Sequence, residues 1–118
     1  MATAQPGATP LQYAPGTTPA AVTAMLGASC VQPGGTQHLS VTAHPGFGVS
    51  YDVQYADGSD GSKHGGTGQS AIPPSGTFQA SWVVAPDTPA GTAVCYVSVA
   101  SGNESAFRQE SFTVSGSC

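Results

Sequence analysis

Two runs of alternating apolar and polar residues, joined by a proline- and glycine-rich corner, constrain this chain more than any other feature. Both lie in residues 75–100, where every second residue is apolar from Phe78 to Val84 and again from Cys95 to Val99. A period of two is typical of β-strands, whose side chains point alternately to opposite faces. Each strand therefore has one apolar face. Because the rest of the chain also has the pattern of strands, we expect that face to pack against a second sheet.

The remaining chain shows the same alternation in short segments separated by turn residues. A short helix over residues 18–26 competes with the first segment, because Ala, Met and Leu favour helix. The absence of a long helical period or a crossover pattern disfavours an α/β fold. The predicted fold is an all-β, antiparallel, two-sheet β-sandwich of about seven short strands. Besides the two strands above, the expected strands are Val22–Cys30, Thr36–Ala43, Val49–Tyr55, the edge segment Ala71–Ile72 and Phe107–Val114.

The parity of these segments also predicts which side chains form the core. In the last strand the parity that turns Phe112 inward also turns Arg108 and Glu110 inward. A β-bulge near these two residues would bring Phe107 into the core instead. The alternative is an edge pair of Arg108 and Glu110 near the rim. The predicted core comprises Tyr51, Val53, Phe78, Trp82, Val97, Val99 and Phe112.

The chain divides into a proline-rich arm and one domain. Residues 1–20 contain four prolines spaced by Ala, Thr and Gly, a composition typical of extended linkers. Leu11 and Tyr13 share parity and are the expected anchors if this arm docks on its own domain or on a neighbour. Residues 21–118 have the length of a single domain. Within it, residues 57–68 are polar and glycine-rich, and we expect a mobile loop.

Few charges limit the partners that this chain can bind. Charged residues make up 7% of the sequence, the net charge is −4, and Lys63 and Arg108 are the only fixed cations. Two cations cannot neutralise a row of phosphates, so nucleic-acid binding is excluded. No apolar run reaches the roughly 18 residues needed to span a bilayer, so no membrane insertion is expected. The Ser-, Thr- and Gly-rich composition with a few cysteines favours a secreted or cell-surface protein.

The residues that carry chemistry are scattered along the sequence. His38 and His44 lie six residues apart on one predicted strand, about 20 Å, and His64 lies in the polar loop, so no metal site is expected. Residues 57–61 resemble the start of a calcium loop, but Gly61 occupies a ligand position of the EF-hand pattern. The sequence has no nucleophile elbow. We therefore expect no catalytic residues, no cofactor and no enzymatic activity.

Several turn and core motifs together carry a resemblance to a known family. The motifs are Val31–Thr36, Tyr55–Gly58, Ser75–Phe78, Ser81–Val84 and Pro86–Thr92. They are similar to those of the immunoglobulin-like domains of bacterial secreted and cell-surface proteins, over roughly residues 22–118. The resemblance implies an immunoglobulin-like sandwich that serves as a spacer, an adhesin module or an accessory domain. It specifies a fold rather than one activity.

The chain has three cysteines, Cys30, Cys95 and Cys118. In the expected sandwich the first and last strands lie side by side and parallel, which brings Cys30 and Cys118 to one pole. We expect a disulfide between them, and such a bridge stabilises a fold by roughly 4 kcal/mol. Cys95 begins a strand at the same pole, so a Cys30–Cys95 bridge is the alternative. The inward parity of Cys95 also fits a buried free thiol.

An exposed aromatic residue marks the expected interaction surface. Tyr96, with Val94, is predicted on the outer face of its strand, and exposed apolar surface usually marks a partner. The leading hypothesis is a non-catalytic extracellular module with a structural or protein-interaction role, whose partners are other modules or copies of itself. One alternative is a self-assembling fibre or surface-lattice subunit that uses the N-terminal arm. Another is a carbohydrate-binding accessory domain that uses Tyr96 and residues 57–68 on a polysaccharide.

Overall fold

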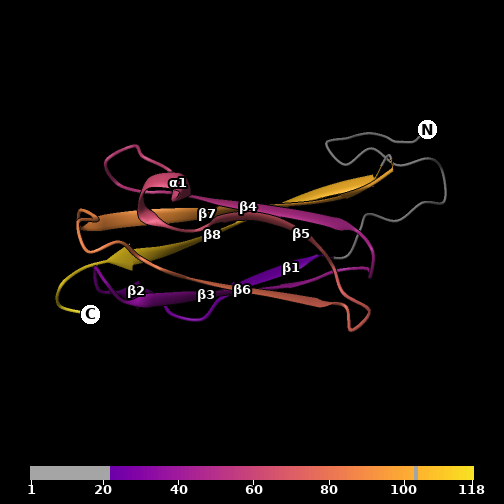
Figure 1. Cartoon of the computed structure of the whole chain (residues 1–118), viewed down its shortest axis with the longest axis horizontal. Helices are drawn as coiled ribbons and strands as arrows, with labels where there is room; N and C mark the ends of the chain where they lie inside the picture. The colour runs from indigo at the N-terminus through magenta and orange to yellow at the C-terminus, as the bar shows by residue number, and fades with distance from the viewer. Residues whose placement is uncertain (1–21, 103) are drawn as a thin grey trace.

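A computed structural model describes residues 22–102 and 104–118 and consists almost wholly of strands (Figure 1). The strands form two facing layers, which confirms the predicted all-β, two-sheet fold. Eight strands are present in this part of the chain, because the predicted first strand is divided in two. The elements are β1 (Thr23–Leu26), β2 (Cys30–Val31), β3 (Thr36–Thr42), β4 (Gly48–Gln54), α1 (Gly61–His64), β5 (Thr67–Ala71), β6 (Thr77–Val83), β7 (Gly91–Ser101) and β8 (Glu104–Val114).

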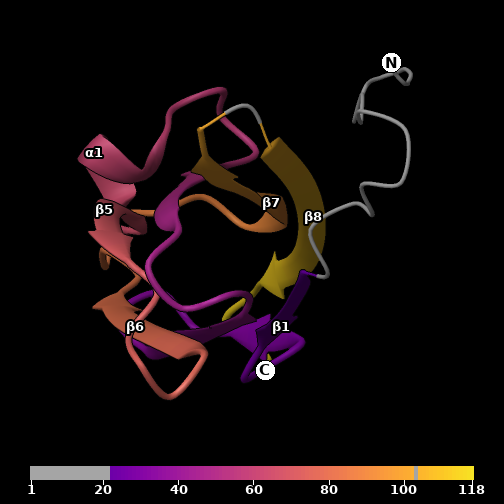
Figure 2. The same cartoon turned by 90° about the vertical axis from the view of Figure 1, so that its right-hand side faces the viewer.

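The two sheets differ in size and curvature. Sheet A has the order β1-β3-β6, and sheet B has the order β2-β8-β7-β4-β5. All neighbouring strands are antiparallel except β2 and β8, which run parallel, as expected for the first and last strands. The view along the long axis shows that sheet B curls from β5 round to β8, while the shorter sheet A closes the open side (Figure 2). The core therefore lies inside a curled sheet rather than between two flat ones.

The predicted strand Val22–Cys30 is not continuous, because the chain leaves sheet A at Gly27 and joins sheet B at Cys30. The buried side chain of Gln37 holds this crossing. Its Oε1 accepts a hydrogen bond from the Ala28 N–H at 3.0 Å, and its Nε2 donates to the Ala28 carbonyl at 2.8 Å. A backbone that crosses between sheets has no ladder partner, and the Gln37 amide supplies one. The competing short helix is wrong where it overlaps described residues, since Thr23–Leu26 is a strand.

The predicted bulge in the last strand is absent, and Phe107 lies outside the core. β7 and β8 pair in one unbroken register from Gly91↔Val114 to Ser101↔Glu104. An unbroken ladder keeps the parity set by Phe112, so Phe107 faces outward and is 69% exposed. The unbroken ladder places Arg108 and Glu110 on one face of β8, as in the alternative, and Arg108 donates from Nε to the Val22 carbonyl at 2.9 Å.

The segment expected to be a mobile loop, residues 57–68, is largely a folded element. Asp60 caps the short helix α1 by accepting a hydrogen bond from the Ser62 N–H at 3.0 Å. The helix ends in the buried side chain of His64, and β5 begins three residues later. The predicted edge strand Ala71–Ile72 thus begins earlier, and Ile72 packs in the core. Backbone pairing with β4, invisible in the local sequence, decides this outcome.

The core follows the predicted parity. Val53, Val97, Val99 and Phe112 are buried as expected. Three predicted core aromatics, Tyr51, Phe78 and Trp82, are only half-buried but pack against the core. Tyr51 and Trp82 stack with ring centroids 5.8 Å apart, close to where β5 borders the sandwich. The remaining buried apolar residues are Val22, Ala24, Val31, Leu39, Val41, Ala43, Val49, Tyr55, Ile72, Val84, Ala93, Cys95, Ala106 and Val114.

The proposed arm, residues 1–20, lies outside the described residues, as do its expected anchors Leu11 and Tyr13. In the part of the chain that the structure describes, no helix has the length and apolar character needed to cross a membrane.

Candidate functional site

The outer face of sheet B carries a regular grid of side chains. Strand register places outward residues of β5, β4, β7 and β8 directly beside one another. Across the sheet from β5 to β8, one row is Thr67, Asp52, Tyr96 and Gln109, and the next is Gln69, Ser50, Ser98 and Phe107. Aromatic rings therefore occupy the β7–β8 side, the Asp52 carboxylate and two serine hydroxyls the middle, and an amide and a hydroxyl the β5 side. Along each strand these outward residues alternate with inward-facing ones, so the packing of the core fixes which residues belong to the grid.

A shallow trough runs over this grid. Its wider part, of ≈ 520 Å³, is lined by residues of both rows, including Asp52, Gln69, Tyr96 and Phe107. A second hollow of ≈ 280 Å³ shares Ser50, Gln69 and Ser98 with the first. The trough continues from the wider part toward this second hollow because the third row has only small side chains. This third row is Ala71, Gly48, Ala100 and Ser105.

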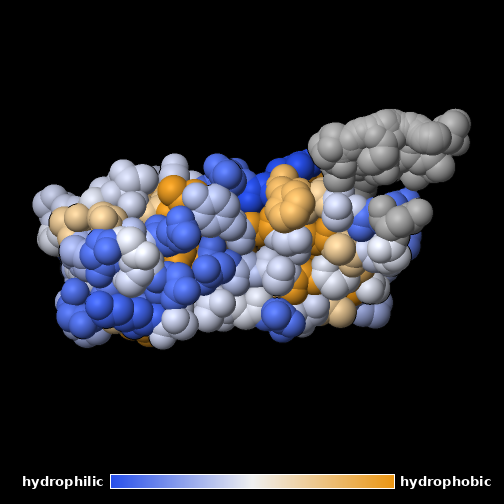
Figure 3. Space-filling model, turned by 90° about the horizontal axis from the view of Figure 1, so that it is seen from above, coloured by the Kyte–Doolittle hydropathy of each residue, from blue (hydrophilic) through white to orange (hydrophobic). Residues whose placement is uncertain are grey.

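The two aromatic residues of the trough are open to solvent. Tyr96 is 38% exposed and Phe107 is 69% exposed. They lie diagonally across the β7–β8 ladder, since Tyr96 pairs with Gln109 and Phe107 with Ser98, which separates them by about 7–8 Å. Figure 3 views the molecule from the sheet B side and shows apolar surface set among neutral and polar side chains. Full burial of a Phe side chain stabilises a fold by about 1.5–3 kcal/mol. Because Phe107 is mostly exposed, it contributes only a small part of this stabilisation.

The structure places only part of the predicted interaction surface. Tyr96 lies outward in the trough, whereas Val94 lies further along β7 and is half-buried. The predicted interaction surface did not include Phe107, Asp52 or Gln69, which also line the trough. The signal for Phe107 was available, since counting back in twos from Phe112 places it on the outer face of its strand. Asp52 and Gln69 join this face through pairing across β4, β7 and β5, which local sequence does not show.

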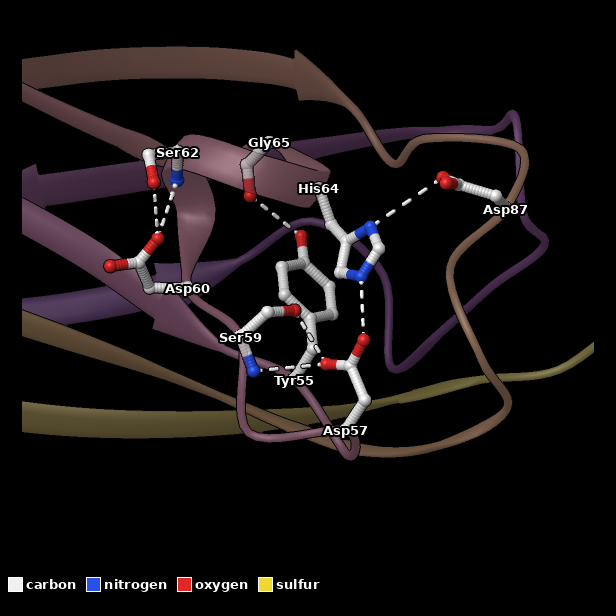
Figure 4. A network of polar contacts seen from close by, with 8 residues as sticks. All are labelled: Tyr55, Asp57, Ser59, Asp60, Ser62, His64, Gly65 and Asp87. Carbon is white, nitrogen blue, oxygen red and sulfur yellow. Dashed lines mark hydrogen bonds and ion pairs between the residues drawn. The ribbon is translucent and has the colours of Figure 1, made fainter.

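A second cluster of polar residues surrounds His64 beneath the loops at one end of the sandwich (Figure 4). The His64 side chain is buried; its Nε2 lies 2.9 Å from Asp57 Oδ2, and its Nδ1 lies 3.6 Å from Asp87 Oδ1. The expectation of a mobile His64 is therefore wrong. The ring packs edge-on against Tyr55, whose hydroxyl donates to the Gly65 carbonyl at 2.7 Å. His64 thus connects the loop after β4 to the loop after β6.

The glycines that follow His64 allow this close packing. Gly66 has φ of 100°, and a Cβ at this position would lie 2.6 Å from Val53 Cγ2 and 2.9 Å from Trp82 Cε2. Both the backbone angle and the space therefore require glycine. The chain can return from α1 to β5 directly over the core only because no side chain is present there.

Hydrogen bonds dominate the electrostatics of the His64 cluster. The Ser59 hydroxyl, then His64, then the Ser59 N–H, hold the pKa of the Asp57 carboxyl well below its usual range. Burial raises the pKa of Tyr55, and the nearby Trp82 indole opposes part of that rise. Asp57 therefore stays ionised beside His64. The buried imidazole therefore connects two loops through the carboxylates of Asp57 and Asp87.

The three cysteines have distinct environments. Cys30 and Cys118 form a disulfide with Cα atoms 5.5 Å apart. This bridge joins β2 to the tail after β8, at the pole where the first and last strands were expected to meet. Cys95 is free and buried, and burial, followed by the carboxylates of Asp52 and Glu110, raises the pKa of its thiol to about 12. A thiol that stays protonated is a poor nucleophile.

Over residues 22–102 and 104–118, no group of three or more His, Cys, Asp or Glu side chains has an arrangement that could hold a metal ion. His38 lies exposed within β3 and His44 lies exposed just after the end of that strand, and neither joins the His64 cluster.

The fold defines the chain as a two-sheet, all-β sandwich with one strongly curled sheet. No protein-family model and no curated protein matches the sequence. Among solved structures, it is similar to the sporulation control protein Spo0M of Bacillus subtilis, with a TM-score of 0.44 and 15% identity over 83% of this chain. A β-glucosidase of Listeria innocua, solved in complex with glucose, gives a TM-score of 0.44 and 11% identity over 82% of this chain. The chain spans 50% of the former and 16% of the latter.

Proposed function

We propose that this chain is a non-catalytic, extracellular, immunoglobulin-like module that binds a partner through the outer face of sheet B. The observation that carries the proposal is the exposed pair Tyr96 and Phe107 in the trough. Both belong to strands that bury apolar residues on the opposite face, so packing of the core does not depend on aromatic rings at these positions. Exposed aromatic groups at the centre of a surface are typical of binding hot spots.

Among the described residues, the other large exposed apolar side chains, Met25 and Val83, do not combine into one patch; Met25 lines a separate hollow of ≈ 380 Å³ on sheet A that has no Tyr, Phe or Trp in its lining. Met25 and Val83 are 66% and 56% exposed on sheet A, but they lie on different strands with β3 between them. Register places Met25 beside Ser40 and Val83 beside Thr36, so the two are also far apart along the sheet. Single exposed apolar residues are ordinary on protein surfaces.

Three features support the class of module. The strand order, with a three-stranded sheet facing a sheet in which β8, β7 and β4 are neighbours, is similar to that of immunoglobulin-like sandwiches. The Cys30–Cys118 disulfide and the low content of charged residues favour an extracellular location. The burial of the His64 imidazole and the inert Cys95 thiol support a non-catalytic role, since neither side chain is placed to reach a substrate.

Serine substitutions at Tyr96 and Phe107 together test the proposal. The double variant should keep its free energy of unfolding within about 0.5 kcal/mol in urea melts, since both side chains are at the surface. It should lose the binding of labelled protein to washed bacterial cell walls, which present extracellular proteins and polysaccharides together. The control variant combines Met25→Ser and Val83→Ser on sheet A and should bind like the wild type.

Equal binding by all three proteins would overturn the proposed face. Absence of both cell-wall binding and self-association in the wild type would overturn the interaction role altogether. If the wild type instead self-associates, as measured by sedimentation equilibrium, and only the Tyr96/Phe107 variant is monomeric, the partner on this face is a second copy of the chain.

A further inference from the structure

We propose that the trough on sheet B binds an uncharged, extended polysaccharide, with Tyr96 and Phe107 as stacking platforms. This inference rests on the proposed function and specifies the ligand of the same face. The trough is an open groove rather than an enclosed pocket, and it extends along the grid into the second hollow through Ser50, Gln69 and Ser98. Such a shape fits a linear chain that enters and leaves at the ends.

The chemistry of the trough matches the two kinds of surface on a sugar ring. The C–H faces of a pyranose pack against aromatic rings, and its hydroxyls need donors and acceptors at the ring edge. Tyr96 and Phe107 supply rings on the β7–β8 side, from diagonally opposed backbone positions about 7–8 Å apart. Gln69 and Thr67 supply amide and hydroxyl groups on the β5 side. A sugar chain lying along the trough would therefore have stacking on one side and hydrogen bonds on the other.

Asp52 is the polar group best prepared for a ligand hydroxyl. It stands in the row of Tyr96, directly beside it across the β4–β7 ladder. Its Oδ1 accepts a hydrogen bond from the Gly61 N–H at 3.2 Å, which fixes the orientation of the carboxylate. Its other oxygen, Oδ2, is then oriented to accept from a ligand hydroxyl. An oriented carboxylate makes stronger hydrogen bonds to hydroxyls than a neutral acceptor does.

The charges around the trough favour a neutral ligand over an anionic one. The fixed cations of the chain are Lys63 and Arg108; Lys63 lies on α1 and Arg108 faces the inner side of β8, and neither lines the trough. Asp52 would repel a uronate or sulfate group. With hydroxyl, amide and aromatic groups as its lining, the trough is complementary to a polymer that carries many hydroxyls and no charge.

The experiment measures retention of the pure, disulfide-intact protein on neutral polysaccharides. The probes are insoluble cellulose and chitin, and soluble dextran, mannan and xyloglucan in affinity electrophoresis, with alginate as the anionic comparison. We expect retention on at least one neutral probe and none on alginate. Tyr96→Ala and Phe107→Ala should each weaken retention at least 10-fold, and Asp52→Asn several-fold. Met25→Ala on sheet A is the matched control and should not change it.

A wild type that binds none of the neutral probes overturns the inference, as does stronger retention on alginate. Binding that survives both Tyr96→Ala and Phe107→Ala overturns the assignment to this trough. Urea melts of each variant identify any loss of binding that comes from unfolding. If the wild type binds cell walls through this face but binds no neutral polysaccharide, the proposed function stands and the ligand class assigned here fails.

Discussion

At the scale of single residues, the most informative side chain is Gln37, a buried amide in the middle of an apolar face. It lies on β3 with the same parity as Leu39 and Val41, both of which are core residues. Its oxygen accepts from the Ala28 and His38 N–H groups at 3.0 and 2.9 Å, and its nitrogen donates to the Ala28 carbonyl. A buried polar group of this kind is stable because both its amide oxygen and its amide nitrogen have hydrogen-bond partners.

Replacement of Gln37 by leucine tests this role. Leucine fills most of the volume but leaves the Ala28 N–H and carbonyl without partners, so we expect a loss of about 2–3 kcal/mol in the free energy of unfolding. Gln79→Leu, on the exposed side of β6, is the matched control and should change stability by less than about 0.5 kcal/mol. Urea melts measure both. A Gln37→Leu variant as stable as the wild type would show that the crossing holds without this amide.

At the scale of elements, the segment from Asp57 to His64 behaves as a clasp between loops. Asp57 follows β4, His64 ends α1, and Asp87 lies after β6. The His64 carbonyl also accepts a hydrogen bond from the Ala85 N–H at 2.9 Å. The clasp fixes where β5 begins, and β5 supplies Thr67 and Gln69 to the outer face of sheet B. The trough is thereby shaped by a cluster on a different part of the surface.

The lowered pKa of the Asp57 carboxyl makes the clasp sensitive to acid. A carboxyl whose pKa is lower in the folded than in the unfolded protein contributes stability above the unfolded value, about 3.9, and loses it as the pH falls toward the folded value. The difference in stability between the wild type and Asp57→Asn should therefore shrink progressively below about pH 4, as measured by urea melts at each pH.

Ser59→Ala is the companion variant, because the Ser59 hydroxyl is the largest cause of the lowered pKa. Its acid dependence should be weaker than that of the wild type. A gap between wild type and Asp57→Asn that stays the same down to pH 2 would contradict the hydrogen-bonding account of the clasp.

At the scale of the whole molecule, the disulfide joins two sites that are distant in sequence. Cys30 and Cys118 are 88 residues apart, so the bridge encloses almost all of the sandwich. It ties β2 to the chain that follows β8, beside the parallel contact of Cys30 with Thr113 and Val31 with Val114. That contact is only two residues long, and two strand residues alone hold a chain weakly.

Removal of the disulfide should destabilise the protein strongly. The Cys30→Ser/Cys118→Ser variant, or the wild type in reductant, should lose about 4 kcal/mol, because an unfolded chain without the bridge has more conformational freedom. Thermal melts with and without dithiothreitol measure the loss. Cys95→Ala is the control and should respond to dithiothreitol as the wild type does. A wild type whose melting is unaffected by reductant would contradict the bridge's role, and titration should find one thiol that reacts only after unfolding.

The sequence by itself determined that this protein is a two-sheet β-structure and which residues of most strands face inward. It could do so because side-chain alternation and Pro/Gly turns are local properties of the chain. Only the tertiary structure decided that the first strand divides at Gly27, that the last strand has no bulge that would bring Phe107 inward, and that His64 lies inside. Each of these depends on a partner distant in sequence: the Gln37 amide, the unbroken β7–β8 ladder, and the carboxylates of Asp57 and Asp87. The trough was unpredictable for the same reason, since its rows exist only where four strands come into register.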